Sequence, residues 1–194
     1  MKPQDNIPTK FIDSLGTRKH MVLFYDEPED AQKIEFRFIK NGLSKGEHCV
    51  YATDEDPKLV IDKMTNYGIA VDDFKKKNLL HVYQLNNPFD HPDGPKKGGE
   101  ENLKMILADS KPPFRIVSGL IPNRTTTEGV RAQMELEQDF HSSFDKYDCS
   151  VICPYNIEKM EPSKRKDWFD MLFSNHHTAI FVPKYGESGV FDLT

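Results

Sequence analysis

The stretch His20-Met-Val-Leu-Phe-Tyr25 is a continuous apolar run that ends at the turn-forming residues Asp26-Glu-Pro28. An apolar run without polar alternation is typical of a strand that is covered on both faces, as in a parallel sheet. From Glu29 onward the apolar residues instead follow a helical period, which stops at Gly42. This part of the chain therefore predicts a buried strand followed by a crossover helix.

The same alternation continues along the chain. Further strands are predicted over residues 49–53, 79–85, 114–118 and 149–153, and residues 179–182 and 189–193 are predicted to form a terminal hairpin. Helices are predicted over residues 57–67, 71–77, 100–109, 125–147 and 162–174, and residues 86–99 form a long, functional or mobile loop. Strands that alternate with helices predict a three-layer α/β domain with a mainly parallel sheet and helices on both faces.

The composition describes one globular domain. The chain has 194 residues, 37% of them hydrophobic, and a net charge of -5, which argues against direct nucleic-acid binding through a general basic field. The three cysteines lie in apolar runs and are expected to be buried and reduced. No apolar run has the length of a membrane span, and the polar N-terminus carries no signal-peptide core. We therefore expect a cytoplasmic protein that does not bind a membrane. Residues 1–15 are interpreted as an N-terminal extension and residues 184–194 as a C-terminal strand or tail.

Ligand sites of open α/β sheets lie at the carboxyl ends of the strands. After the first strand the chain reads Asp26-Glu-Pro-Glu-Asp30, where a phosphate-binding loop would need glycines and a Gly-Lys-Ser/Thr ending. After the fourth strand it reads Ser118-Gly119-Leu120, where an ATPase would place an aspartate near magnesium. Both elements of a P-loop ATPase are absent from the sequence, which predicts that the protein is not an enzyme of that class.

The passage from Phe38 to Glu55, FIKNGLSKGEHCVYATDE, resembles the "helix, Gly-Leu, Gly-Glu, apolar Tyr strand, acidic end" of RecA/KaiC-type ATPases. Together with the first strand, Glu137, Cys153-Pro-Tyr155-Asn156 and His176-His177, it makes residues 16–183 resemble the MEDS family of DcmR-type sensory domains. The resemblance implies a RecA-like fold that has lost its ATP loop and that senses small, hydrocarbon-derived ligands in bacterial and archaeal regulators. The chain departs from the family pattern at Asn156, where Asp is expected, and at His176-His177-Thr178, where His-Pro is usual, so either His176 or His177 corresponds to the family histidine.

The candidate ligand-binding residues follow the strands at this edge or come from the resemblance. They are Tyr25, Asp26, Thr53, Glu55, Arg124, Tyr155 and Asn156 by position and Glu137 by resemblance, with His20, Tyr51, His176 and His177 as additional candidates. Arg124 would bind an anionic ligand group or neutralise the edge carboxylates. His20 opens the first strand about 17 Å from its other end, at ~3.3 Å per residue, so it is interpreted as structural rather than as part of the edge pocket.

No metal and no cofactor is assigned. His176 and His177 would need further ligands from the fold, and the only other cluster in the sequence is His91 with Asp90 and Asp93. The predicted function is a non-enzymatic module that senses a small, apolar or one-carbon ligand and acts through a separate regulatory protein. A homo-oligomer is left open. The alternatives are a divergent nucleotide-binding protein and an ATPase-derived interaction scaffold.

Overall fold

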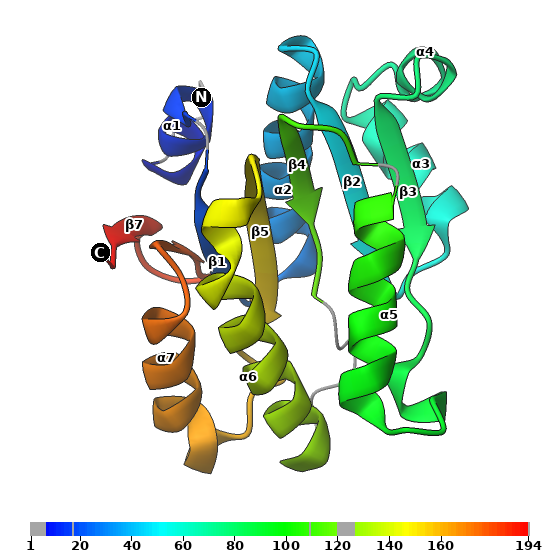
Figure 1. The fold of residues 1–194 in the computed structure, drawn as a ribbon. Helices are drawn as coiled ribbons and strands as arrows, with labels where there is room; N and C mark the ends of the chain where they lie inside the picture. The colour runs from blue at the N-terminus through cyan, green and yellow to red at the C-terminus, as the bar shows by residue number, and fades with distance from the viewer. Residues whose placement is uncertain (1–6, 17, 109, 120–126, 194) are drawn as a thin grey trace.

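The computed structural model describes residues 7–16, 18–108, 110–119 and 127–193, which build a seven-stranded sheet between two layers of helices (Figure 1). The strands are β1 (His20–Tyr25), β2 (His48–Thr53), β3 (Leu80–Gln84), β4 (Phe114–Val117), β5 (Cys149–Asn156), β6 (Thr178–Val182) and β7 (Gly189–Asp192). Their order is β3-β2-β4-β5-β1-β6-β7. All neighbours pair in parallel except β6 and β7, which form the predicted antiparallel hairpin.

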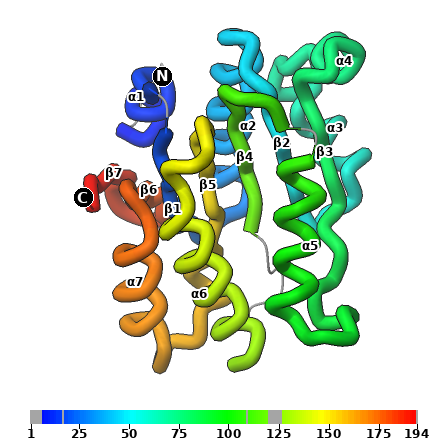
Figure 2. The backbone as a smooth tube through the Cα atoms, in the orientation of Figure 1, coloured from blue at the N-terminus to red at the C-terminus, as the bar shows by residue number. Residues whose placement is uncertain are grey.

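The helices divide between the two faces of the sheet. They are α1 (Ile7–Ser14), α2 (Pro28–Ser44), α3 (Pro57–Asn66), α4 (Val71–Lys76), α5 (Pro95–Ala108), α6 (Thr127–Ser142) and α7 (Arg165–Ser174), with short 3-10 turns at Pro88–Asp90, Phe144–Lys146 and Pro162–Lys164. Figure 2 shows α5, α6 and α7 side by side on one face, and α2 behind the sheet on the other. The α/β class and the three-layer architecture predicted from the sequence are confirmed.

Alternate residues of the strands contribute to two separate hydrophobic cores, one on each face of the sheet. On β1, Val22 and Phe24 pack under α5 to α7, whereas Met21 and Leu23 pack under α1 to α4. All four side chains are fully buried. The continuous apolar run that opened the sequence argument is therefore a central strand covered on both sides, because neither face of the sheet reaches water there.

A buried ion pair accounts for Gly42 in the last turn of α2 and for Gly46-Glu47 directly after this helix. Arg115 on β4 is 1% exposed, donates from Nε to the carboxylate of Glu47, and donates from Nη1 to the carbonyl oxygen of Phe38 at 3.0 Å. Gly42 makes room for it, since a Cβ at this position would lie 2.5 Å from Arg115 Cδ. Gly46 turns the chain with a φ of +79°, a region that favours glycine, and so brings Glu47 to the arginine.

Two boundaries differ from the sequence prediction. The predicted loop 86–99 is shorter, because α5 already begins at Pro95. Its Gly98 packs against Pro88, where a Cβ would lie 2.6 Å from Pro88 Cα, so this glycine serves close packing rather than a loop. The fifth strand continues to Asn156 instead of ending at residue 153.

The N-terminal extension and the long helix α6 also differ from the sequence prediction. The interpreted N-terminal extension contains α1, whose Ile12 is buried in the core beneath α2. Asp13 of the same helix forms an ion pair with Arg37 at 2.5 Å. The long helix predicted to residue 147 ends at Ser142 and is followed by a 3-10 turn, and its predicted start at residue 125 lies outside the described residues.

Candidate functional site

A cleft of about 580 Å³ opens over the carboxyl ends of β1, β2, β4 and β5. Its floor consists of strand ends, one wall is the first half of α2, and Met160 and Trp168 stand on the opposite side. The lining residues are Tyr25, Pro28, Ala31, Gln32, Glu35, Tyr51, Ala52, Thr53, Asp54, Glu55, Leu85, Val117, Gly119, Pro154, Tyr155, Asn156, Lys159, Met160 and Trp168. Aromatic and apolar groups with a few polar atoms are the usual lining of a small-molecule site.

The fold gathers most of the predicted edge residues around this cleft. Six of them line it together: Tyr25, Tyr51, Thr53, Glu55, Tyr155 and Asn156. Asp26 is not part of the lining; instead, it forms hydrogen bonds that connect two neighbouring segments. Its backbone carbonyl accepts from Asn156 Nδ2 at 3.2 Å, and its carboxylate accepts from the backbone N–H of Lys184 at 2.9 Å. Arg124 lies outside the described residues.

Glu35 is a cleft residue that the sequence reading missed. It lies on the inner side of α2, is 3% exposed, and its Oε2 accepts a 2.6 Å hydrogen bond from the hydroxyl of Tyr51. Burial raises the pKa of the Glu35 carboxyl to about 7, against the opposing effect of the Tyr51 hydrogen bond. The only sequence signal was a Glu on the apolar stripe of a helix, which in this structure is the buried side.

The charges of the cleft are mostly negative. Glu55 accepts from Gln32 Nε2 at 3.2 Å and from Lys63 Nζ at 2.7 Å, and Asp54 lies beside it. Among the described lining residues, Lys159 is the only cation. An acidic rim of this kind repels a triphosphate, in agreement with the acidic loop read from the sequence.

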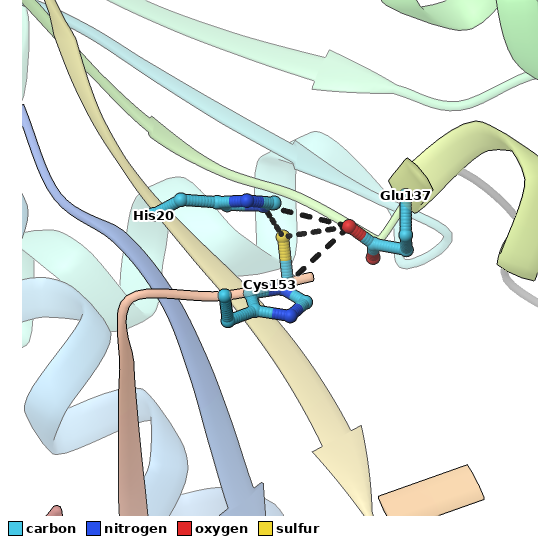
Figure 3. Close-up of side chains that lie close together, drawn as sticks. His20, Glu137 and Cys153 are labelled. Atoms are coloured by element: carbon cyan, nitrogen blue, oxygen red, sulfur yellow. Dashed lines mark hydrogen bonds and ion pairs between the residues drawn. The ribbon is translucent and has the colours of Figure 1, made fainter. Parts of the chain in front are cut away.

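A second group of polar side chains lies buried between the sheet and α6 (Figure 3). Nε2 of His20 lies 3.4 Å from Oε2 of Glu137 and 3.4 Å from Sγ of Cys153. Oε2 of Glu137 is also 3.6 Å from Nε2 of His176 and 3.9 Å from Sγ of Cys153. One ligand atom from each of the four residues lies within 4.8 Å of the other three. We call these four residues the His-Glu-Cys-His cluster.

Glu137 and His176 are held by hydrogen bonds from outside the cluster. Tyr155 donates from its hydroxyl to Glu137 Oε1 at 2.6 Å, and Gln133 Nε2 donates to the same oxygen at 2.7 Å. Nδ1 of His176 lies 2.7 Å from the carbonyl oxygen of Leu172. A carbonyl only accepts, so Nδ1 carries a proton and Nε2 of the neutral ring presents a lone pair to the cluster.

Burial and the charge environment decide the protonation of the cluster. Burial, and next to it the neighbouring His20, lower the pKa of His176 to about 3, so this ring is neutral at physiological pH. Burial alone would raise the pKa of the Glu137 carboxyl, but its hydrogen bonds with His20 and Tyr155 outweigh burial and hold this pKa below its usual range. Glu137 is therefore a carboxylate inside the core.

The cluster corrects several expectations from the sequence. Glu137 was expected on an exposed helix face unless the family resemblance held, and it is 3% exposed. The sequence left open whether the fold brings further metal-ligand types to the histidines, and the structure places His20, Glu137 and Cys153 around His176. His177 points elsewhere, because its Nδ1 accepts from the backbone N–H of His20 at 3.0 Å. His20 lies away from the cleft as predicted. Its neighbours in the cluster, Glu137, Cys153 and His176, could not be predicted from the periodicity of the sequence.

The family model of the MEDS domain, the methanogen/methylotroph, DcmR sensory domain, matches residues 19–170. The chain belongs to the MEDS family. Three members of the His-Glu-Cys-His cluster lie inside this match, and His176 lies beyond it. As a MEDS chain the protein is assigned to a family of sensory domains.

A comparison with solved structures identifies the fold of this MEDS chain. A KaiC-like protein from the hyperthermophilic archaeon Pyrococcus horikoshii OT3 superposes with a TM-score of 0.59 at 16% identity. The similarity covers 91% of this chain and 77% of the other. The RecA/KaiC-like fold is thus confirmed. No curated protein matches the sequence. A search of the described helices found no segment with the length and hydropathy of a membrane span.

Proposed function

We propose that this MEDS domain is a non-enzymatic sensor that binds a small, mainly apolar ligand in the cleft over the strand ends. The observation that carries the proposal is the cleft itself, whose volume of about 580 Å³ suits a small molecule. Tyr25, Tyr51 and Tyr155 line it beside a few polar side chains such as Thr53 and Asn156, which suits a ligand with an apolar body and one polar group.

Three features favour this proposal over nucleotide hydrolysis. Pro28 begins α2 where a phosphate loop would place glycine, lysine and serine or threonine. The first turn of α2 carries Glu29 and Asp30, whose charges occupy the positive end of the helix dipole. Near the end of β4, Gly119 contributes to the lining and carries no carboxylate for magnesium. We further propose that the signal passes to a separate regulatory protein of a bacterial or archaeal system.

Thermal-shift screening tests the proposal. The probes are alcohols, amines and halides of one to four carbons, and ATP with Mg²⁺ is the competing ligand. A ligand at 100 times its Kd stabilises the native state by about 2.7 kcal/mol, which raises Tm measurably. We expect at least one organic probe to raise Tm of the wild type and no effect of ATP.

The cleft is tested by a matched pair of tyrosine variants. Tyr25→Ala removes a lining side chain, whereas Tyr67→Ala removes a half-buried tyrosine on the same side of the sheet that does not line the cleft. The probe should still raise Tm of Tyr67→Ala and lose its effect on Tyr25→Ala. The proposal fails if no organic probe stabilises the wild type, or if Tyr25→Ala responds to it fully. Magnesium-dependent ATP hydrolysis by the wild type would favour the nucleotide-binding alternative.

A further inference from the structure

We propose that the His-Glu-Cys-His cluster is a binding site for one divalent metal ion of the zinc class, with Nε2 of His20, Oε2 of Glu137, Sγ of Cys153 and Nε2 of His176 as its ligands. This inference does not depend on the cleft or on the proposed function, because the cluster lies inside the core.

The distances between the ligand atoms fit a tetrahedral ion. Bonds of about 2.0–2.3 Å to nitrogen, oxygen and sulfur place tetrahedral ligands about 3.3–3.7 Å apart. Three of the six separations within the cluster are 3.4, 3.4 and 3.6 Å, and the Glu137 to Cys153 separation is 3.9 Å. The two remaining separations, from Nε2 of His176 to His20 and to Cys153, are within 4.8 Å, so His176 would move toward these two residues when an ion binds.

The ligand atoms face inward because their other ends are already engaged. Nδ1 of His176 is bonded to the Leu172 carbonyl, and its Nε2 is a buried atom without a hydrogen-bond partner in the structure. Nδ1 of His20 lies 3.4 Å from Nδ1 of His141, which leaves Nε2 toward the cluster. Oε1 of Glu137 takes the hydrogen bonds of Tyr155 and Gln133, so Oε2 is the oxygen that faces His20 and His176. Metal-binding imidazoles and carboxylates are oriented in this way.

The charges also balance. The four side chains are between 0% and 5% exposed, and a charge in such a place must be compensated. The Cys153 thiolate and the Glu137 carboxylate together neutralise a divalent cation, while the two neutral imidazoles add no charge. On binding, Cys153 releases its thiol proton to solvent.

A mixed set of imidazole, thiolate and carboxylate suits zinc better than magnesium or calcium, which take oxygen ligands. A cavity of about 20 Å³ borders Glu137 and Cys153, and its other walls are mostly apolar. One water needs about 10–15 Å³, so a fifth ligand of that size can be accommodated.

The test is metal analysis of the full chain, produced in minimal medium that contains either Zn²⁺ or Co²⁺. We expect about one metal ion per chain, and in the cobalt form a thiolate-to-cobalt charge-transfer band with the visible absorption of tetrahedral Co²⁺. Cys153→Ser should lose the charge-transfer band, and His176→Gln should lose at least roughly tenfold in bound metal. Far-UV circular dichroism establishes that each variant is folded.

Cys149→Ser is the matched control, since Cys149 is a buried thiol four residues earlier on the same strand and outside the cluster. It should keep both the metal and the band, as should Cys49→Ser. If Cys153→Ser and His176→Gln do not fold, the two controls still decide the donor, because a band that survives in both of them leaves Cys153 as the one of the three thiols that is not excluded. The proposal is overturned by metal-free wild type from supplemented medium and after refolding with excess Zn²⁺, or by a charge-transfer band that survives in Cys153→Ser or disappears in Cys149→Ser.

Discussion

The hydroxyl of Tyr155 donates a 2.6 Å hydrogen bond to Oε1 of Glu137. Tyr155 lines the cleft, whereas the other carboxylate oxygen of Glu137 belongs to the His-Glu-Cys-His cluster. One tyrosine therefore connects the cleft with the cluster at this end of β5. Its side chain is 1% exposed and cannot exchange its hydrogen bond for water.

Tyr155→Phe removes one of the hydrogen bonds that hold the buried carboxylate of Glu137. We expect a loss of about 1–3 kcal/mol in the free energy of unfolding, because an ionised buried acceptor loses a donor. Urea denaturation measures this loss. Tyr185→Phe is the control, since Tyr185 is 82% exposed and should leave the stability unchanged. Equal stabilities for Tyr155→Phe and the wild type would contradict the assigned hydrogen bond.

Glu47→Gln leaves the buried guanidinium of Arg115 without its carboxylate. Breaking such a pair from one side costs about 3–5 kcal/mol, because the remaining charge stays in the core without compensation. Chemical denaturation followed by tryptophan fluorescence should show this loss. Asp170→Asn breaks the exposed pair with Lys166 and should change the stability little. A small effect of Glu47→Gln would mean that Arg115 reaches solvent.

Gly42→Ala should destabilise the protein although alanine is the better helix former. The added Cβ would meet Arg115 Cδ at 2.5 Å and Cys49 Sγ at 2.8 Å. Overpacking of this kind costs about 1–3 kcal/mol, which exceeds the helix-propensity gain. Ser44→Ala in the last turn of the same helix is the control and should be neutral or slightly stabilising, because Ser44 is exposed. A more stable Gly42→Ala would show that the arginine has room to move.

Glu35 predicts a pH dependence of stability. Its pKa is raised from 4.5 to about 7 in the folded state, so the native protein holds this proton more tightly than the unfolded chain. The corresponding stability is present below pH 4.5 and is lost as the pH rises through about 7. By linkage the change amounts to roughly 3 kcal/mol.

Glu35→Gln keeps the shape and a hydrogen-bond partner for Tyr51 but cannot ionise. Relative to the wild type, this variant should become progressively more stable between pH 5 and pH 8, as measured by urea denaturation at each pH. The difference between the two proteins is the readout, since other carboxylates such as Asp13, whose pKa is lowered to about 2, act in the opposite direction in both. A constant difference across this range would show that Glu35 is ionised throughout.

The sequence predicted the sheet because its strands are long apolar runs, and burial on both faces leaves that local trace. It failed at Pro154, which was expected to end the fifth strand. Proline is tolerated there because β4 pairs with β5 only as far as Ile152, so no donor is required from residue 154 on that side. The prediction also failed at Gly98, which was placed in a loop but lies in α5. A glycine that permits close packing and a glycine that permits a loop look alike in a single sequence.

The candidate residues divide in the same way. Tyr25, Thr53 and Asn156 were found because parallel strands end at one edge, which is a property of the fold class. The contact of Glu137 and His176 with His20 was not predicted. These two residues come from α6 and from the segment before β6, and only the packed structure brings them to His20. Glu35 was not singled out because a carboxylate at a buried helix position leaves no periodic signal beyond one polar residue on an apolar stripe.

Asp26 connects the rim of the cleft to the turn between β6 and β7. Its backbone carbonyl is bonded to Asn156 at the rim, and its carboxylate is bonded to Lys184 in the turn between β6 and β7. Asn156 is thus linked to the β6–β7 hairpin at the edge of the sheet through two hydrogen bonds of one residue, Asp26. The turn of this hairpin carries the exposed ring of Tyr185, so the rim of the cleft and a surface aromatic side chain share one anchor directly after β1.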